Sequence, residues 1–476
     1  MKASSCWRFW PFALRLWLIG CCTAGLLPNH AVVAAELQSL RPAKPDGTPI
    51  QVTAKLEVGG LLEMAADATA DKNSDTQADK SPNSSAGKNT QTVPMSVVAQ
   101  FSYDEQRLDD GSGPAHRMAV RYYDDAQAVI KIASKVTKPQ LRDRRKLITV
   151  VANKDTAYLA SPDGPLTRDE LELIDIPANT LILDQLLPDS DVEIGHRWKP
   201  SADALARFLC LDSVGHTEVD CLLTSVKDNV AEITLDGTLG GAIDGVATEI
   251  ELKAKLLFDI ELQLPKTLLL AIKEQRGIGH VGPGLDVVAK LKLNIAPRPD
   301  SKLLTADVVK SAKLPESDTP PPLEYIAAEK GFRFTYDRRW HLTRDDPDLV
   351  VMRLIDRGDL VAQCNVSASP IDAKKPLALA EFQTDVQQAL GKLFGKFDRA
   401  NESTTSSDVR ILLSVVDGAA ADLPIQWRYY LLHDQQGHGV TVVFTMEQPL
   451  VEQFHDQDTP IINSVEFVEP KVASRK

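Results

Sequence analysis

Apolar and polar side chains alternate most regularly between residues 249 and 264, EIELKAKLLFDIELQL. Nearly every second residue there is apolar, and charged or amide side chains fill most of the gaps. A period of two is typical of a β-strand with one apolar and one solvated face. The pattern therefore predicts one long strand, 249–264, whose apolar face needs a cover. The residues of this face that could contact a hydrophobic ligand are Leu252, Leu256, Phe258, Ile260 and Leu262.

Further strands are predicted by shorter stretches of the same alternation. In the first part of the chain they are residues 50–58, 97–103, 118–132, 147–159, 231–235 and 287–295. Asp-Gly pairs at 236–237 and 244–245 predict turns between strands. Later in the chain the predicted strands are residues 331–336, 350–355, 361–367, 409–416, 425–432 and 440–446. Apolar residues three or four positions apart between Leu379 and Leu393 predict a helix among them.

Proline marks a division of the chain. The segment PESDTPPP at 315–322 favours an extended connector, because consecutive prolines support neither a helix nor a sheet ladder. We expect an α+β architecture, with antiparallel sheets as a sandwich or half-barrel before the connector and an α/β sandwich after it. The expected division is a β-rich region at 36–310 with a disordered insertion at 65–92, a linker at 311–322, an α/β domain at 323–468 and a tail at 469–476.

The first residues have the features of an export signal. Basic residues accompany an apolar run at 16–27, and small residues follow up to Ala35. This pattern predicts a signal peptide at 1–35 that is cleaved after Ala35, and hence a secreted or periplasmic protein.

Two alternatives to cleavage at that site stay open. Residues 18–21, LIGC, match a lipobox, which would make the protein a lipoprotein anchored by an acylated Cys21. The apolar run could also remain as an uncleaved anchor. No later stretch approaches the ~18 apolar residues of a membrane span, so no transmembrane segment is expected in the mature chain.

Charge and cysteine content narrow the partners. The formal net charge is −13, which disfavours nucleic acid and anionic membrane surfaces as general partners. Cys210 and Cys221 could form a disulfide in an oxidising compartment, or both could be small buried residues, and Cys364 would be a lone buried thiol.

Candidate chemistry is sparse. Residues 277–282 match G-x-G-x-x-G, but Pro283, Gly284 and then an alternating strand follow, so they predict a hairpin connection rather than a dinucleotide site. The basic stretch at 135–146 predicts a solvated hairpin tip, with a local anion site as the alternative. His433 and His438 flank a turn without a third ligand at metal spacing. We expect no metal site, no cofactor and no catalytic residues.

One part of the chain resembles a known family. The segment GFRFTY at 331–336 with Trp340, the predicted helix, and the segment IINSVEF at 461–467 resemble the first strand, helix and last strand of the PsbP/DcrB-like α/β sandwich family. That resemblance implies a non-enzymatic accessory or envelope protein. Residues 36–310 look like uncharacterised β-rich secreted proteins of planctomycete-type bacteria. Their architecture is also similar to periplasmic lipoprotein carriers of the LolA kind, whose half-open sheets hold acyl chains.

These observations favour an exported, non-enzymatic envelope protein that acts by binding or scaffolding. Its partner would be an unknown envelope protein or a hydrophobic small molecule. The first alternative is a LolA-like carrier of a lipid or another hydrophobic ligand, and the second is an enzyme of an unrecognised class. The cover of the long strand distinguishes the first two, because a second sheet indicates a scaffold and an open cavity of several hundred Å³ indicates a carrier.

Overall fold

The computed structural model describes residues 36–65, 90–108, 117–153, 157–312, 319–369, 371–405 and 407–469. The chain divides into the units Met1–Glu36 and Leu37–Lys476, and the elements named below lie in the second unit. The predicted signal peptide with Cys21 and Ala35, nearly all of the predicted insertion, and the tail beyond 469 lie outside the described residues.

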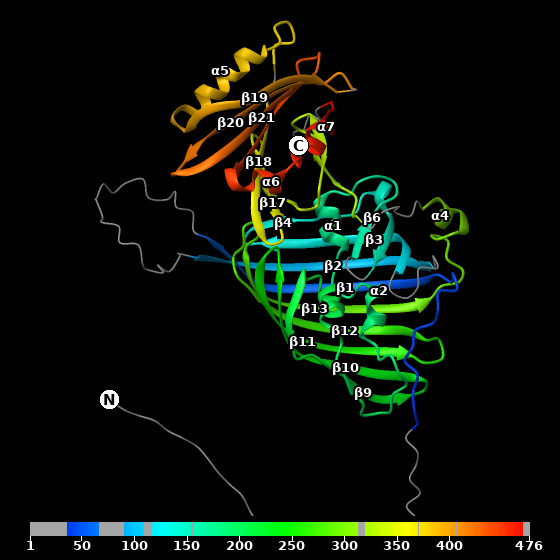
Figure 1. Cartoon of the computed structure of the whole chain (residues 1–476). Coiled ribbons are helices and arrows are strands. Elements are labelled where there is room, and N and C mark those ends of the chain that lie inside the picture. The colour runs from blue at the N-terminus through cyan, green and yellow to red at the C-terminus, as the bar shows by residue number, and fades with distance from the viewer. Residues whose placement is uncertain are drawn as a thin grey trace, which may run out of the picture. The chain divides into compact units, whose positions relative to one another are not determined.

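One antiparallel sheet occupies the first part of the chain (Figure 1). Its strand order is β6-β5-β3-β2-β1-β13-β12-β11-β10-β9-β7, with β4 paired to β3 and β8 paired to β10. The bounds are β1 Ile50–Ala65, β2 Thr90–Leu108, β3 Arg117–Ile132, β4 Lys135–Thr137, β5 Leu147–Ala152, β6 Ala157–Ala160, β7 Arg197–Trp198, β8 Ser213–Thr217, β9 Asp220–Lys227, β10 Val230–Ile243, β11 Val246–Asp259, β12 Leu264–Arg276 and β13 Gly284–Pro297. The alternating stretches therefore form strands, and residues 277–282 form the β12–β13 hairpin connection, as predicted. The stretch 147–159, predicted as one strand, instead contributes two strands, β5 and β6, which pair antiparallel with each other.

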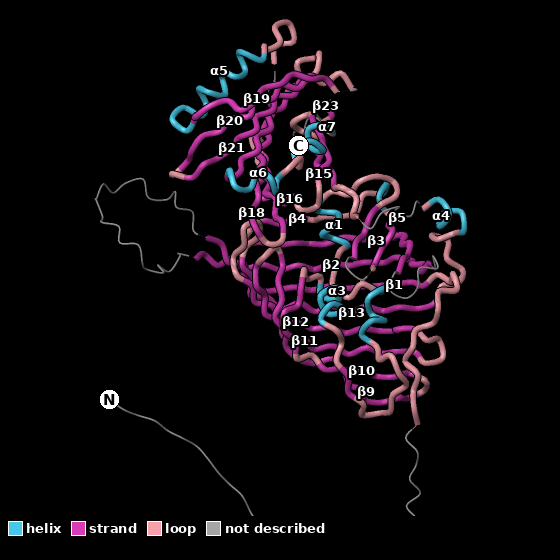
Figure 2. Tube along the Cα trace, in the orientation of Figure 1, coloured by secondary structure: helices cyan, strands magenta, loops and turns pink. Residues whose placement is uncertain are grey.

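Three short helices pack on the apolar face of this sheet (Figure 2). They are α1 Arg168–Ile174, α2 Thr180–Leu183 and α3 Ala202–Leu209. Leu173, Leu181 and Phe208 of these helices belong to the same buried cluster as Leu252 and Leu256 of β11. The apolar face is thus covered by helices, an arrangement that fits the half-open sheet better than the sandwich.

The predicted long strand ends earlier than expected. β11 stops at Asp259, and residues 260–263 form a turn into β12. The Asp259 carboxylate accepts a hydrogen bond from the Leu262 backbone N–H at 3.0 Å, and Gln263 adopts φ 50°. The apolar alternation continued past the strand because Ile260, in the turn, still packs against the core.

The predicted turn at 236–237 is wrong, whereas that at 244–245 is confirmed. Asp236 and Gly237 lie inside β10, where Gly237 has φ 154°. A Cβ at Gly237 would lie 2.3 Å from the Glu218 carbonyl oxygen, so glycine is needed for the close approach of the β8–β9 connection.

Two smaller sheets form the second part of the chain. Their orders are β14-β15-β23 and β16-β17-β18-β22-β21-β20-β19. The bounds are β14 Leu323–Ala327, β15 Phe332–Tyr336, β16 Trp340–Asp345, β17 Val350–Asp356, β18 Asp359–Ala368, β19 Phe394–Thr404, β20 Arg410–Ala420, β21 Leu423–His433, β22 Gly439–Glu447 and β23 Glu466–Phe467. The helices of this part are α5 Leu379–Leu390, α6 Val451–Phe454 and α7 Asp458–Asn463, whereas α4 Ala306–Ser311 precedes the proline connector.

The predicted helix is confirmed as α5, which packs on one face of the larger of these sheets. Phe382 and Val386 of α5 join a buried cluster with Trp427 of β21. Trp340 belongs instead to the main core, where its ring lies 5.8 Å from that of Phe444. Both tryptophans are therefore packing residues.

The segment 461–467 is mostly not a strand. Residues 461–463 belong to α7, and only Glu466–Phe467 form β23. The buried Asp458 at the start of α7 accepts hydrogen bonds from Arg428 at 2.9 Å and Tyr430 at 2.7 Å. These bonds hold a helix where the resemblance to the PsbP/DcrB-like family implied a strand.

Residues on the two sides of the proline connector are in direct contact. The Glu324 N–H donates to the Leu166 carbonyl at 2.8 Å, and the Arg338 guanidinium donates to the Leu159 carbonyl at 2.7 Å. Leu166 and Leu323 belong to one hydrophobic cluster. The core of the first part therefore continues into the second.

The Leu256→Asp substitution tests which face of the large sheet is buried. Leu256 is 1% exposed, so an unpaired carboxylate there should lower the free energy of unfolding by several kcal/mol, about 4 or more. Leu269→Asp is the matched control, because Leu269 lies on the solvated face at 44% exposure and should change stability by less than about 1 kcal/mol. Urea unfolding measures both, and equal losses would contradict the assignment of faces.

Candidate functional site

A cavity of about 430 Å³ lies between the apolar face of the large sheet and α1. Its lining is predominantly apolar and comes from β1, β2, β3, β4 and the residues that follow β4, and from α1 with Ile176 just beyond it. The lining residues are Leu56, Val97, Ala99, Phe101, Ala128, Ile130, Thr137, Lys138, Pro139, Asp169, Glu172, Leu173 and Ile176.

Small side chains explain why the sheet leaves space here. Leu56, Ala99 and Ala128 lie directly opposite one another on β1, β2 and β3. Two alanines in adjacent positions cannot reach α1, whose Leu173 forms the facing wall together with Ile176. The small side chains of one cross-strand row therefore account for the cavity.

Polar residues line only part of the cavity. Thr137 ends β4 and Lys138 follows it, whereas Asp169 and Glu172 belong to α1, and all four are exposed to solvent. Because exposed polar residues accompany an otherwise apolar lining, they mark the side from which solvent reaches the cavity.

The position of α1 depends on one carboxylate. Thr167 and Glu170 form a capping box, in which the Thr167 N–H donates to Glu170 at 2.9 Å. Glu170 also accepts hydrogen bonds from the Arg142 side chain, and Arg142 donates to Glu324 at 2.6 Å. Burial favours the neutral form of Glu170, but the bonds from Arg142 and Thr167 outweigh it and lower its pKa.

The predicted solvated tip at 135–146 is therefore wrong in its second half. Arg145 is buried, and Arg142 pairs with Glu170 and Glu324, which are only 4% and 6% exposed. Because α1 and β14 bring these two carboxylates together, the arginines neutralise charges that lie far apart in the sequence. Lys135 and Lys138 remain exposed, as predicted.

A second, more polar recess of about 560 Å³ lies beyond the end of α1. A small gap of about 10 Å³ lies between the two spaces. Phe101 and Ile176 line both this gap and the apolar cavity, and Asp175 and Asn179 line both the gap and the recess. The other residues of the recess are Ala157, Asp203, Ala206, Arg207, Cys210, Leu211, Asp212 and Pro320. Apolar and polar spaces thus meet at the end of α1.

The structure does not join the two cysteines considered for a disulfide. Cys210 ends α3 in the left-handed conformation, φ 57°, and its sulfur lies 4.0 Å from an Asp175 oxygen. Cys221 is buried in β9, with its sulfur 3.9 Å from the Leu186 carbonyl oxygen. Both are free thiols, as is the buried Cys364.

The residues predicted to contact a hydrophobic ligand do not line this cavity. Leu252, Leu256 and Phe258 are buried in the core, Ile260 is half-buried, and Leu262 is 50% exposed in the turn after β11. The cavity is built from β1–β3 instead. The alternating stretches 50–58 and 97–103 predicted the strands that form its wall. The sequence did not predict which strands α1 leaves uncovered, because this depends on contacts between residues far apart in the chain.

His433 and His438, the pair weighed as possible metal ligands, lie in different surroundings. Within the described ranges no three His, Cys, Asp or Glu side chains could hold a metal ion. His438 pairs with Asp434 at 2.7 Å, whereas His433 is buried. No helix among the described residues is long and apolar enough to cross a membrane.

Comparison with known proteins gives partial likenesses. No family model matches the chain, and no curated protein matches it. Cyanobacterial PsbP (CyanoP) from Synechocystis sp. PCC 6803 is similar at 14% identity over 33% of this chain and 98% of its own, with a TM-score of 0.26. The immunity protein TplEi of the T6SS from Pseudomonas aeruginosa is similar at 13% identity over 46% of this chain and 74% of its own, with a TM-score of 0.20.

Arg142→Met should destabilise the protein by about 3 kcal/mol, because it leaves two buried carboxylates without their main cation. Arg145 remains 3.7 Å from Glu324 and moderates the loss. Arg144→Met is the control, since Arg144 is exposed and should change stability by less than about 1 kcal/mol. Urea unfolding at neutral pH measures both variants.

The same pair of proteins gives a pH test. In the natural protein the lowered pKa of Glu170 contributes stability above the ordinary glutamate pKa, and this contribution is lost as the pH falls through the lowered value. In the Arg142→Met variant burial dominates and raises that pKa, so acid restores stability. The difference in unfolding free energy between the natural protein and the Arg142→Met variant should therefore become smaller as the pH is lowered. A difference that does not change with pH would contradict the role of Arg142.

Proposed function

We propose that this protein is an exported carrier that binds an apolar molecule, such as the acyl chain of a lipid, in the cavity beneath α1. The observation that carries the proposal is the open, mainly apolar cavity of about 430 Å³ between α1 and β1–β3. This volume falls within the range of about 300–1,000 Å³ of small-molecule sites. The carrier is a binding function, and it is favoured over scaffolding because helices rather than a second sheet cover the apolar face.

The lining supports an apolar ligand. Phe101, Val97 and Ile130 offer no hydrogen-bonding side chains, so water inside the cavity gains little from them. At about 0.8 kcal/mol per buried methylene, about ten methylenes would contribute roughly 8 kcal/mol, which corresponds to micromolar binding. Exposed Lys138 and Glu172 can contact a polar end of the ligand at the solvent side.

The lining also favours binding over catalysis. It contains no serine, cysteine or histidine, and its polar groups are exposed residues rather than a nucleophile with an adjacent base. The polar recess past Asp175 and Asn179 gives room for a ligand that has a polar part. We therefore propose an amphipathic or apolar ligand that is held without covalent chemistry, in a protein whose export is expected from its first 35 residues.

Native mass spectrometry of the mature protein, purified from its own envelope in a gentle detergent-free buffer, tests the proposal. We expect a bound mass that is lost on delipidation and regained with a lipid extract. A bare polypeptide that takes up nothing from the extract would contradict it.

Val97→Trp should abolish ligand uptake, because the indole fills the cavity from its β2 wall. Val98→Trp is the matched control, since the next residue of the same strand points to the solvated face and is 44% exposed. Uptake of a fluorescent long-chain fatty acid should fall at least tenfold in the first variant and stay unchanged in the second. Equal uptake by both would place the ligand elsewhere.

A further inference from the structure

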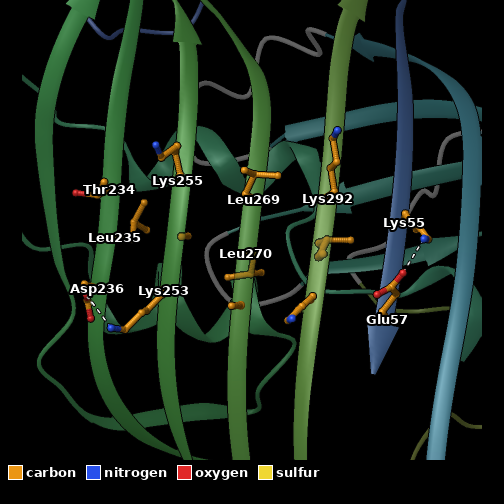
Figure 3. Close-up of a pocket in the computed structure, with 14 residues that line it drawn as sticks. Lys55, Glu57, Thr234, Leu235, Asp236, Lys253, Lys255, Leu269, Leu270 and Lys292 are labelled. Carbon is orange, nitrogen blue, oxygen red and sulfur yellow. Dashed lines mark ion pairs between the residues drawn. The ribbon is translucent and has the colours of Figure 1, made fainter. Parts of the chain in front are cut away.

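The solvated face of the large sheet carries a shallow groove of about 680 Å³, on the side opposite the helices (Figure 3). Strands β10, β11, β12, β13 and β1 form it. Five lysines line it, against two carboxylates, although the whole chain is acidic. The lysines are Lys55, Lys253, Lys255, Lys290 and Lys292, and we call this surface the lysine groove.

The register of the strands sets the lysines in two columns. Lys253 and Lys255 lie on β11, and Lys290 and Lys292 lie on β13. Between them β12 presents Leu269, opposite both Lys255 and Lys292. Strands are about 4.8 Å apart, so the columns are about 10 Å apart across an apolar floor.

Carboxylates neutralise only part of this charge. Lys253 pairs with Asp236 at 3.6 Å and Lys255 with Glu232 at 2.9 Å (Figure 3 shows the first pair). Among the described residues, no carboxylate lies within ion-pair distance of Lys290 or Lys292, although Glu57, which is bound to Lys55, lies directly opposite Lys290 on β1. The β13 column is thus the part of the groove that is open to an anion.

Lys292 also faces another cation. Lys55 lies directly opposite it on β1 and pairs with Glu57 at 2.6 Å. Like charges at directly opposed positions of a sheet are destabilising, and an anion bound between them would relieve that repulsion. The lysines also lower the pKa of the Glu57 carboxyl group, chiefly through its hydrogen bond to Lys55 and further through the charge of Lys290.

Exposed apolar side chains accompany the lysines. Leu269 in the floor, Val288 beside Lys290 on β13, and Val98 opposite Glu57 on β2 are 44%, 45% and 44% exposed. Lysines whose stems lie beside exposed apolar groups are typical of surfaces that meet lipid headgroups, where the ammonium groups contact phosphate and the apolar groups enter the acyl boundary.

We propose that the lysine groove is the surface by which this protein docks on an anionic lipid bilayer. Headgroup phosphates bind between the two lysine columns, and Leu269 contacts the acyl boundary. The net charge of −13 opposes general adhesion to such a bilayer but permits docking by this one face, because the acidic remainder of the protein is repelled and faces away. The overall charge therefore makes docking weak and orients it.

Vesicle flotation at low ionic strength tests the proposal. Natural protein should float with phosphatidylcholine vesicles that contain phosphatidylglycerol, should not float with pure phosphatidylcholine, and should be released by salt. The variant K290Q/K292Q should bind about 25-fold more weakly, from a roughly fivefold contribution per lysine at a membrane surface. The control K374Q/K375Q removes the same charge from two exposed lysines of the second part and should bind as the natural protein does.

Absence of flotation with anionic vesicles would overturn the proposal. Equal losses in the two lysine variants would also overturn it, since net charge alone would then explain the binding. Calorimetric binding of inorganic polyphosphate without any vesicle binding would assign the groove to a soluble anion instead. Val97→Trp should float as the natural protein does, so failure of the docking surface is distinguishable from failure of the cavity.

Discussion

The packing of α1 on the large sheet depends on Glu170. Its carboxylate caps the helix through Thr167, pairs with Arg142 and so connects α1 to Glu324 of β14. Each of these bonds alone is modest, but they converge on a buried charge that could not stay ionised without them. These bonds fix the position of α1, whose Leu173, together with Ile176 just beyond the helix, faces Ala99 and Ala128 across the cavity.

The sequence predicts those features of the fold that depend on residues close together in the chain. Alternation reveals strands such as β1 and β2 because it depends on neighbouring residues, and the capping box at Thr167 is equally local. The end of β11 was missed because Ile260 stays apolar in a turn, and Gly237 was misjudged because the chain that approaches it, at Glu218, is not its neighbour in sequence.

The candidate site is less predictable for the same reason. The hydrophobic-ligand face was assigned to β11, where alternation is strongest, but a strong pattern marks a well-covered face, as the burial of Leu252 and Phe258 confirms. The cavity forms where the small residues Ala99 and Ala128 leave space beneath α1. The charges that hold the helix come from Arg142 and Glu324, which are 182 positions apart.

The cavity and the lysine groove lie back to back on β1. Leu56 lines the cavity, while its neighbours Lys55 and Glu57 line the groove, because successive side chains point to opposite faces of a strand. Docking through the groove would therefore turn the helix-covered face away from the bilayer. If both proposals hold, the membrane would position the protein rather than load its cavity. The solvent side of the cavity, with Lys138 and Glu172, would then stay accessible to a donor or acceptor of the ligand.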